Sequence, residues 1–180
     1  MEGLDIGIIV LCPDRNIGGL KNTVASVTHH CWNRECIGIV GNDATKEELA
    51  EMGEICPSYK GKDTITSLVN KGMRHLKHEW GFIIFGGSRV QHFLERKFTT
   101  FANYENEILF PIVERRCNFV DGSFNGVLIN KKFFKTVGKF PEADLQKEGI
   151  NDFEMAKLFW AIDAIEKGAK FKGIIGMRVI

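Results

Sequence analysis

The chain has 180 residues, of which 44% are hydrophobic and 26% charged, and its formal net charge is +1. This length suffices to bury the core of one domain, and the balanced charge argues against a nucleic-acid or anionic membrane surface as partner. No apolar stretch approaches the length that spans a bilayer. Five scattered cysteines indicate free thiols in a reducing compartment. We therefore expect a cytoplasmic protein with a single domain over residues 1–180.

The first half of the chain predicts alternating strands and helices. Residues 6–11 form a continuous apolar and β-branched run, which is typical of a strand buried on both faces of a parallel sheet. Leu20, Val24, Val27 and Cys31 then recur with helical spacing. Further strands are predicted at 36–40, near 55–59 and at 82–85, and further helices at 47–53 and 65–76. This order predicts a parallel sheet with right-handed crossovers.

Two helix starts carry recognisable capping residues. Thr45 and Glu48 have the spacing of a capping box, in which each side chain accepts a hydrogen bond from the other residue's backbone N–H. Asp63 and Thr64 are a second candidate N-cap, before the most regular apolar stripe in the chain.

The second half predicts a less regular series of elements. Helices are expected at 93–104, at 131–137 and from 152 to about 167, and extended segments at 107–113, 119–129 and 170–180. Gly138 and Gly168 follow two of these helices, where glycine commonly ends a helix. The fold class is therefore α/β, with a mainly parallel central sheet flanked by helices.

Three common site motifs are absent or incomplete. After the first strand the chain reads Pro13-Asp14-Arg15-Asn16, which has neither a dinucleotide-binding glycine pattern nor a P-loop. The later "GGSRV" resembles a strand–turn–helix that exposes a nucleophilic serine. However, the last histidine is His92, so no acid followed by histidine can complete a hydrolase triad after it.

The histidines do not suggest a metal centre. The run from His29 to Cys31, together with Cys36, lacks a second pair of ligands, and we interpret it as core cysteines beside exposed histidines. His75 and His78 are expected on the solvent face of their helix, because the apolar stripe runs through neighbouring positions.

Two acidic positions remain as candidates for chemistry. Asn42 and Asp43 follow the second strand, where they could hydrogen-bond a ribose or a base edge, although Asp43 could equally cap the next helix. Asp152 opens the long helix, and it too could simply be an N-cap.

Several motifs together resemble a known family over nearly the whole chain. They are "IIVLCPDRN", "LKNTVASV…CIGIVGNDATKEE", Asn70-Lys71-Gly72, "DGSFNGVLINKKFFKTVGKFPE" and "NDFEM" with a later Gly-Ala-Lys-Phe. In order and spacing they resemble the GT-A fold of nucleotide-diphospho-sugar transferases, especially the inverting family 2 glycosyltransferases.

The resemblance implies a donor, an acceptor and site residues. The donor would be a nucleotide-diphosphate sugar of UDP or GDP type, and the acceptor a glycan or other hydroxyl compound. Residues 1–90 would form a nucleotide-binding half, in which Pro13, Asp14, Asn42 and Asp43 hold the base and ribose. Residues 91–180 would form an acceptor-side half, with Asp152 as the general base.

One motif departs from the family. "FIIFGGSRV" has Gly86-Gly87-Ser88 where the family has the Asp-x-Asp that holds a divalent cation, so both metal carboxylates are missing. Arg89 could neutralise the diphosphate directly, or be an ordinary surface arginine. Asn151 also replaces a family Glu next to the general base.

Two hypotheses follow from these departures. The chain is an active sugar transferase, or it is a degenerate member of the fold that binds nucleotide or glycan, or serves as an interaction module, without turnover. A nucleotidyltransferase of related topology is less favoured, because the Gly-rich basic signature after the first strand is absent.

Overall fold

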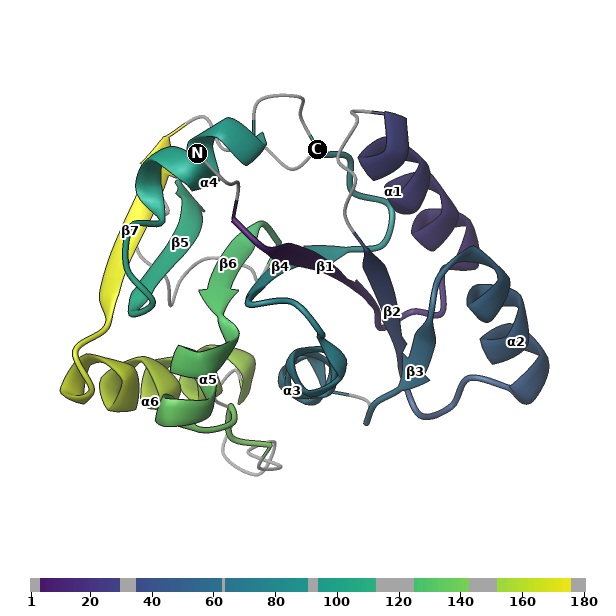
Figure 1. Cartoon of the computed structure of the whole chain (residues 1–180). Helices are drawn as coiled ribbons and strands as arrows, with labels where there is room; N and C mark the ends of the chain where they lie inside the picture. The colour runs from purple at the N-terminus through teal and green to yellow at the C-terminus, as the bar shows by residue number, and fades with distance from the viewer. Residues whose placement is uncertain are drawn as a thin grey trace.

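The computed structural model describes residues 4–29, 35–62, 64–90, 94–112, 125–142 and 152–175 (Figure 1). Its strands are β1 (Ile6–Cys12), β2 (Cys36–Val40), β3 (Ser58–Lys60), β4 (Trp80–Phe85), β5 (Glu107–Ile112), β6 (Val127–Asn130) and β7 (Lys170–Ile175). Its helices are α1 (Ile17–His29), α2 (Lys46–Ile55), α3 (Ile65–His75), α4 (Leu94–Phe101), α5 (Lys131–Val137) and α6 (Asp152–Glu166). None of the described helices is long and apolar enough to cross a membrane.

The seven strands form one sheet in the order β3-β2-β1-β4-β6-β5-β7. β1 lies between β2 and β4 and is parallel to both, with Ile9 opposite Ile37 and Ile83. β6 is antiparallel to β4 and to β5, and β7 is parallel to β5. All strands except β6 therefore point the same way, and we call the edge where these strands end the carboxyl edge.

Helices cover both faces of the sheet. Along β1, Ile8 and Val10 face the core beneath α1, α2 and α4, whereas Ile9 and Leu11 face the core beneath α3, α5 and α6. Figure 1 shows α3, α5 and α6 along the lower side of the sheet, with α1 and α4 above it. A strand buried on both faces needs no polar alternation, which explains the continuous apolar run at the start of the chain.

The predicted helix ends are confirmed in detail. The Thr45 hydroxyl accepts from the Glu48 N–H at 3.1 Å, and the Glu48 carboxylate accepts from the Thr45 N–H at 2.8 Å. Thr64 caps α3 by accepting from the Ser67 N–H, while Asp63 lies outside the described residues. Gly138 ends α5 with φ 108°, a conformation that strongly favours glycine.

Two local expectations need correction. His75 does not face solvent freely, because its ring stacks on Tyr59 with centroids 3.8 Å apart and its Nε2 is buried. His78 is half-buried and lies 2.6 Å from Asp5 and 3.3 Å from Glu35. All three contacts are with residues outside the helix, so the helical spacing of the apolar residues could not predict them.

Candidate functional site

Six of the seven predicted site residues lie in three loops at the carboxyl edge. These loops follow β1, β2 and β4, and the residues are Pro13, Asp14, Asn42, Asp43, Ser88 and Arg89. All of them are exposed except Ser88, which is buried. The loops are neighbours because the ends of adjacent parallel strands meet at one edge, which is also where ligands bind in open α/β sheets.

Arg15 joins the loop after β1 to the loop after β2. Its guanidinium lies 3.4 Å from the Asp43 carboxylate and 3.9 Å from that of Glu48. Its backbone is left-handed, with φ 57°, and its N–H donates to the Cys12 carbonyl across a tight turn. The sequence drew attention to the neighbours of Arg15 and not to Arg15 itself, because a left-handed arginine leaves no local pattern.

The loop after β4 is fastened to α1. The Gly87 N–H donates to the Gly19 carbonyl at 2.9 Å and to the Thr23 hydroxyl at 3.0 Å. The same Thr23 hydroxyl donates to the Ser88 carbonyl at 2.8 Å, and Ser26 accepts from the Val90 N–H at 3.0 Å. The loop is therefore held by at least three residues of one helix.

Ser88 points into the protein, towards β6. Its hydroxyl donates to the Asn125 side-chain oxygen at 3.2 Å, and the same oxygen accepts from the Phe85 N–H at 3.0 Å. Arg89, the next residue, is exposed. Of the two residues assigned to a diphosphate region, only Arg89 therefore presents its side chain to solvent.

The residues at the end of β4 do not fit a divalent cation of the kind the fold family implies. Gly86, Gly87 and Ser88 supply no carboxylate, and hard cations are held chiefly by anionic oxygens. Within the described ranges no three His, Cys, Asp or Glu residues are grouped so that they could hold a metal ion. Of the histidine–cysteine run, His30 and Cys31 lie outside those ranges.

A second polar cluster lies beyond the end of β3. The Lys62 ammonium donates to the Glu142 carboxylate at 3.0 Å, and the Asn70 amide donates to the same carboxylate at 3.2 Å. Asn70 is buried, and its side-chain amide also donates to the Phe140 carbonyl and accepts from the Phe140 N–H, each at 2.9 Å. The Lys62 hydrogen bond is the main reason that the pKa of Glu142 falls below its ordinary value. This cluster joins α3 to the segment that leads towards α6.

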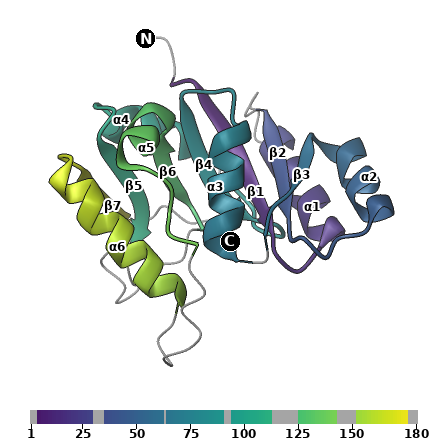
Figure 2. The same cartoon turned by 90° about the horizontal axis from the view of Figure 1, so that it is seen from below.

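Asp152 is the first residue of α6, and its side chain and the preceding Asn151 lie outside the described part of the chain. β7 runs in the same direction as β4, and α6 directly precedes β7. Since β7 begins at the edge opposite the carboxyl edge, α6 must run from the carboxyl edge, where it starts, to that opposite edge, where β7 begins. Figure 2 shows α3 and α6 starting at the edge where β1 ends.

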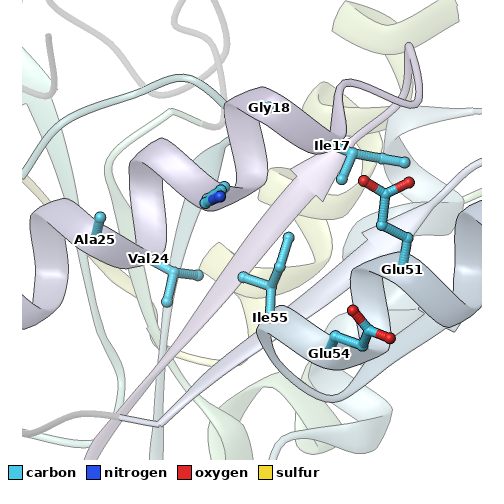
Figure 3. A pocket seen from close by; sticks show the side chains of 8 residues that line it. Ile17, Gly18, Val24, Ala25, Glu51, Glu54 and Ile55 are labelled. Carbon is cyan, nitrogen blue, oxygen red and sulfur yellow. The ribbon is translucent and has the colours of Figure 1, made fainter.

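A groove of about 530 Å³ lies between α1 and α2 (Figure 3). It is lined by Ile17, Gly18, Lys21, Val24, Ala25, Glu51, Glu54 and Ile55. None of the predicted site residues is among them. The groove offers two carboxylates and one lysine, which is a poor match for a nucleotide diphosphate.

These features together define a class of fold. The mostly parallel seven-stranded sheet with one reversed strand, covered by helices on both faces, matches a GT-A-like fold.

Solved structures of two other proteins share it. The 4-diphosphocytidyl-2C-methyl-D-erythritol synthase from Anaerococcus prevotii DSM 20548 matches with a TM-score of 0.60 and 15% identity, over 99% of this chain and 93% of that one. TarS 1–349 from S. aureus matches with a TM-score of 0.63 and 9% identity, over 98% of this chain and 59% of that one. The same TarS fragment in complex with UDP also has a TM-score of 0.63.

The present chain thus spans somewhat more than half of the TarS fragment it matches. Neither a protein-family model nor a curated protein matches the sequence. At these identities the structural similarity shows the fold alone.

Proposed function

We propose that this chain binds a nucleotide-diphosphate sugar at the carboxyl edge and transfers the sugar to a hydroxyl acceptor, such as a glycan, by inverting displacement. The Arg15–Asp43 ion pair carries this proposal, because it joins the loops after β1 and β2 into one polar surface at the edge where α6 begins. The UDP complex of TarS, a protein with the same fold, supports a nucleotide as ligand. The donor would be of UDP or GDP type, and the location cytoplasmic.

The two halves of the chain have separate roles in this proposal. Residues 1–90 hold the nucleotide, with Pro13, Asp14, Asn42 and Asp43 at the base and ribose. Residues 91–180 receive the acceptor. The exposed Arg89 supplies positive charge in the diphosphate region. Ser88 contributes only through its position in the loop, because its hydroxyl already donates a hydrogen bond to Asn125.

Asp152 acts as the general base in the transfer step. Its carboxylate takes the proton of the acceptor hydroxyl while the hydroxyl oxygen forms a bond to the anomeric carbon of the sugar. The bond from that carbon to the diphosphate breaks on the opposite face, and its electron pair leaves with the nucleoside diphosphate. Attack opposite to the leaving group inverts the anomeric configuration.

A second candidate function is binding without turnover. The observation that favours it is the loop after β4, where Gly86, Gly87 and Ser88 carry no carboxylate and the Ser88 hydroxyl is directed to Asn125. A protein of this kind would still bind a nucleotide or a glycan, or act as an interaction module, but would not stabilise the leaving group through a metal ion.

Two measurements distinguish the transferase from binding without turnover. The first is calorimetric titration with UDP, GDP and their sugar conjugates, and the second is an assay for released nucleoside diphosphate. Binding together with release supports the transferase, and binding without release over a panel of hydroxyl acceptors supports the second candidate. If none of these nucleotides binds, both nucleotide-based proposals are wrong. The Asp43→Asn variant serves as the control for the location of the site. If it gives the same binding heat as the unmodified chain, the nucleotide does not bind at the proposed surface.

A further inference from the structure

At the end of β4, Gly86 packs closely against β1 and α1. A Cβ atom built on Gly86 would lie 2.9 Å from the Cys12 sulfur and 3.4 Å from the Leu20 backbone nitrogen. Real Cβ atoms essentially never approach another heavy atom to within 3.0 Å. Cys12 is fully buried in the core, so any shift of its sulfur to make room would disturb the surrounding packing. A side chain at position 86, a carboxylate included, therefore has to displace this sulfur.

α1 contacts the backbone of the next residue, Gly87, although a Cβ atom on Gly87 itself would meet nothing within 4 Å. A Cβ atom on Gly19 would lie 2.9 Å from the Gly87 backbone nitrogen, so helix and loop touch backbone to backbone. Gly87 itself has φ 95°, a conformation that side chains rarely adopt. Gly19 allows the helix to approach the end of β4 more closely than a larger residue would, whereas Gly87 is suited to its position by its positive φ.

Several polar groups of this loop are already hydrogen-bonded within the protein. The Gly86 N–H donates to the Leu11 carbonyl at 2.8 Å, and the Ser88 N–H donates to the Phe85 carbonyl at 3.1 Å. The Ser88 carbonyl accepts from Thr23, and the Ser88 hydroxyl donates to Asn125. A cation placed here would have to compete with these bonds for its oxygen ligands.

The Cys12 thiol beside Gly86 is also unsuited to a divalent cation. Burial is the main cause that raises the pKa of the Cys12 thiol to about 12, so the group is a neutral thiol and not a thiolate at neutral pH. In the adjoining loop after β2, the Asp43 carboxylate is paired with Arg15, so a cation would have to compete with this ion pair for it. Hard cations such as Mg²⁺ and Mn²⁺ need several oxygen ligands, which the described residues do not bring together here.

We infer that the packing of Cys12 and α1 against Gly86 closes the end of β4 to a divalent cation, and that a nucleotide binds at the carboxyl edge without one. The second part rests on the proposed function, whereas the closure of the strand end stands independently of it. The diphosphate charge then has to be met by side-chain cations, of which Arg89 is the exposed one in this loop.

Two titrations of the unmodified chain test the two parts separately. In the first, Mn²⁺ alone is followed by the electron paramagnetic resonance signal of the free ion, and we expect no stoichiometric site with a Kd below about 1 mM. A stoichiometric Mn²⁺ site tighter than this would overturn the closure. In the second, the Kd of UDP is measured in Mn²⁺ and in EDTA, and we expect agreement within about twofold. A tenfold or greater loss of affinity in EDTA would overturn metal independence.

The two titrations also separate this inference from the proposed function. If UDP and GDP bind under neither condition, the proposed function fails, while the Mn²⁺ titration still decides whether the strand end is closed.

A pair of variants tests the packing itself. Gly86→Asp returns a carboxylate to the strand end, and we expect a lower unfolding midpoint and no new Mn²⁺ site. Adding Cys12→Ala removes the sulfur atom that conflicts with the new side chain. The double variant should therefore regain part of the decrease in unfolding midpoint that Gly86→Asp causes. A Gly86→Asp variant as stable as the unmodified chain, or one that binds Mn²⁺ stoichiometrically, contradicts the role given to Cys12.

Discussion

The Arg15 guanidinium and the Asp43 carboxylate meet at 3.4 Å, although the two residues belong to loops that follow different strands. Their side chains are 42% and 60% exposed. An ion pair so exposed stabilises a protein by only about 0–1 kcal/mol. We therefore expect substitution of either residue to affect ligand binding much more than folding.

The first prediction concerns Asp43. Asp43→Asn keeps the shape of the side chain but removes its charge, so both the pairing with Arg15 and any charged hydrogen bond to a ligand are weakened. We expect the affinity for UDP or GDP to fall about tenfold, since hydrogen bonds to charged groups contribute about 1.5–3 kcal/mol. Calorimetry measures this change. The control is Glu47→Gln, which neutralises an exposed carboxylate in the first turn of α2. Equal affinities for the two variants would remove Asp43 from the site.

The second prediction concerns the general base. Asp152→Asn should lower the rate of sugar transfer by about 10²–10⁴-fold, the usual contribution of a general base. The Kd of the nucleotide should change little, because the proposed base serves the acceptor. Asp163→Asn, at an exposed position of the same helix, should retain the full rate. A transfer rate that survives Asp152→Asn would show that another group takes the proton.

The third prediction compares two glycines that both have open space around them. A Cβ atom on either Gly138 or Gly53 would meet nothing within 4 Å, but only Gly138 has a positive φ, of 108°. Gly138→Ala should therefore destabilise the chain by about 1–3 kcal/mol through backbone strain. Gly53→Ala, inside α2, should stabilise it by about 0.4–1 kcal/mol through the unfolded state. Urea unfolding measures both, and changes of the same sign would contradict the assigned backbone conformations.

The fourth prediction concerns a buried carboxylate between α4 and β7. Glu107 is 1% exposed, and it accepts from Lys172 at 2.6 Å. Burial alone would raise the pKa of Glu107, but hydrogen bonds from Lys172 and two backbone N–H groups outweigh burial and lower it. An acid whose pKa is lower in the folded state stabilises the fold above its ordinary pKa, and this stabilisation disappears as the pH falls through the lowered value.

Glu107→Gln should accordingly destabilise the chain by about 1–3 kcal/mol near neutral pH. The difference from the unmodified chain should shrink as the pH falls below the ordinary pKa of a glutamate, about 4.3, because the unfolded chain then takes up a proton before the native chain does. Urea unfolding at several pH values measures the difference. Glu105→Gln is the control, since the Glu105 side chain is 59% exposed in its pair with Lys132. A difference that does not change with pH would mean that the charge of Glu107 does not stabilise the fold.

Most helices and strands could be predicted because their signals are local. Strand β2 was predicted with its observed bounds, and the capping box at Thr45 and Glu48 marked the start of α2 within one residue. The extended segment expected at 119–129 is described only from residue 125, and there it forms the short strand β6, Val127–Asn130. Nothing in that sequence shows that β6 runs against its neighbours, since direction is set by long-range pairing.

The candidate site was predictable only as a set of loops. A strand end followed by polar residues indicated Asn42 and Asp43, because parallel strands place such loops at one edge, whereas Pro13 was implied only by the family resemblance. The role of Arg15 depends on a positive φ and on a partner in another loop. The inward direction of Ser88 depends on Asn125, 37 residues away. Contacts between residues so far apart in the sequence cannot be predicted from local composition.

The sequence by itself determined that strands and helices alternate, where most of them begin and end, and that the end of β4 lacks metal-binding carboxylates. Apolar periodicity, caps and the identity of a few residues are sufficient for these statements. Only the tertiary structure decided the strand order, the reversal of β6 and the filling of the space beside Gly86 by Cys12. The physical reason is close packing, since whether a position has room for a side chain depends on atoms that the chain brings there from elsewhere.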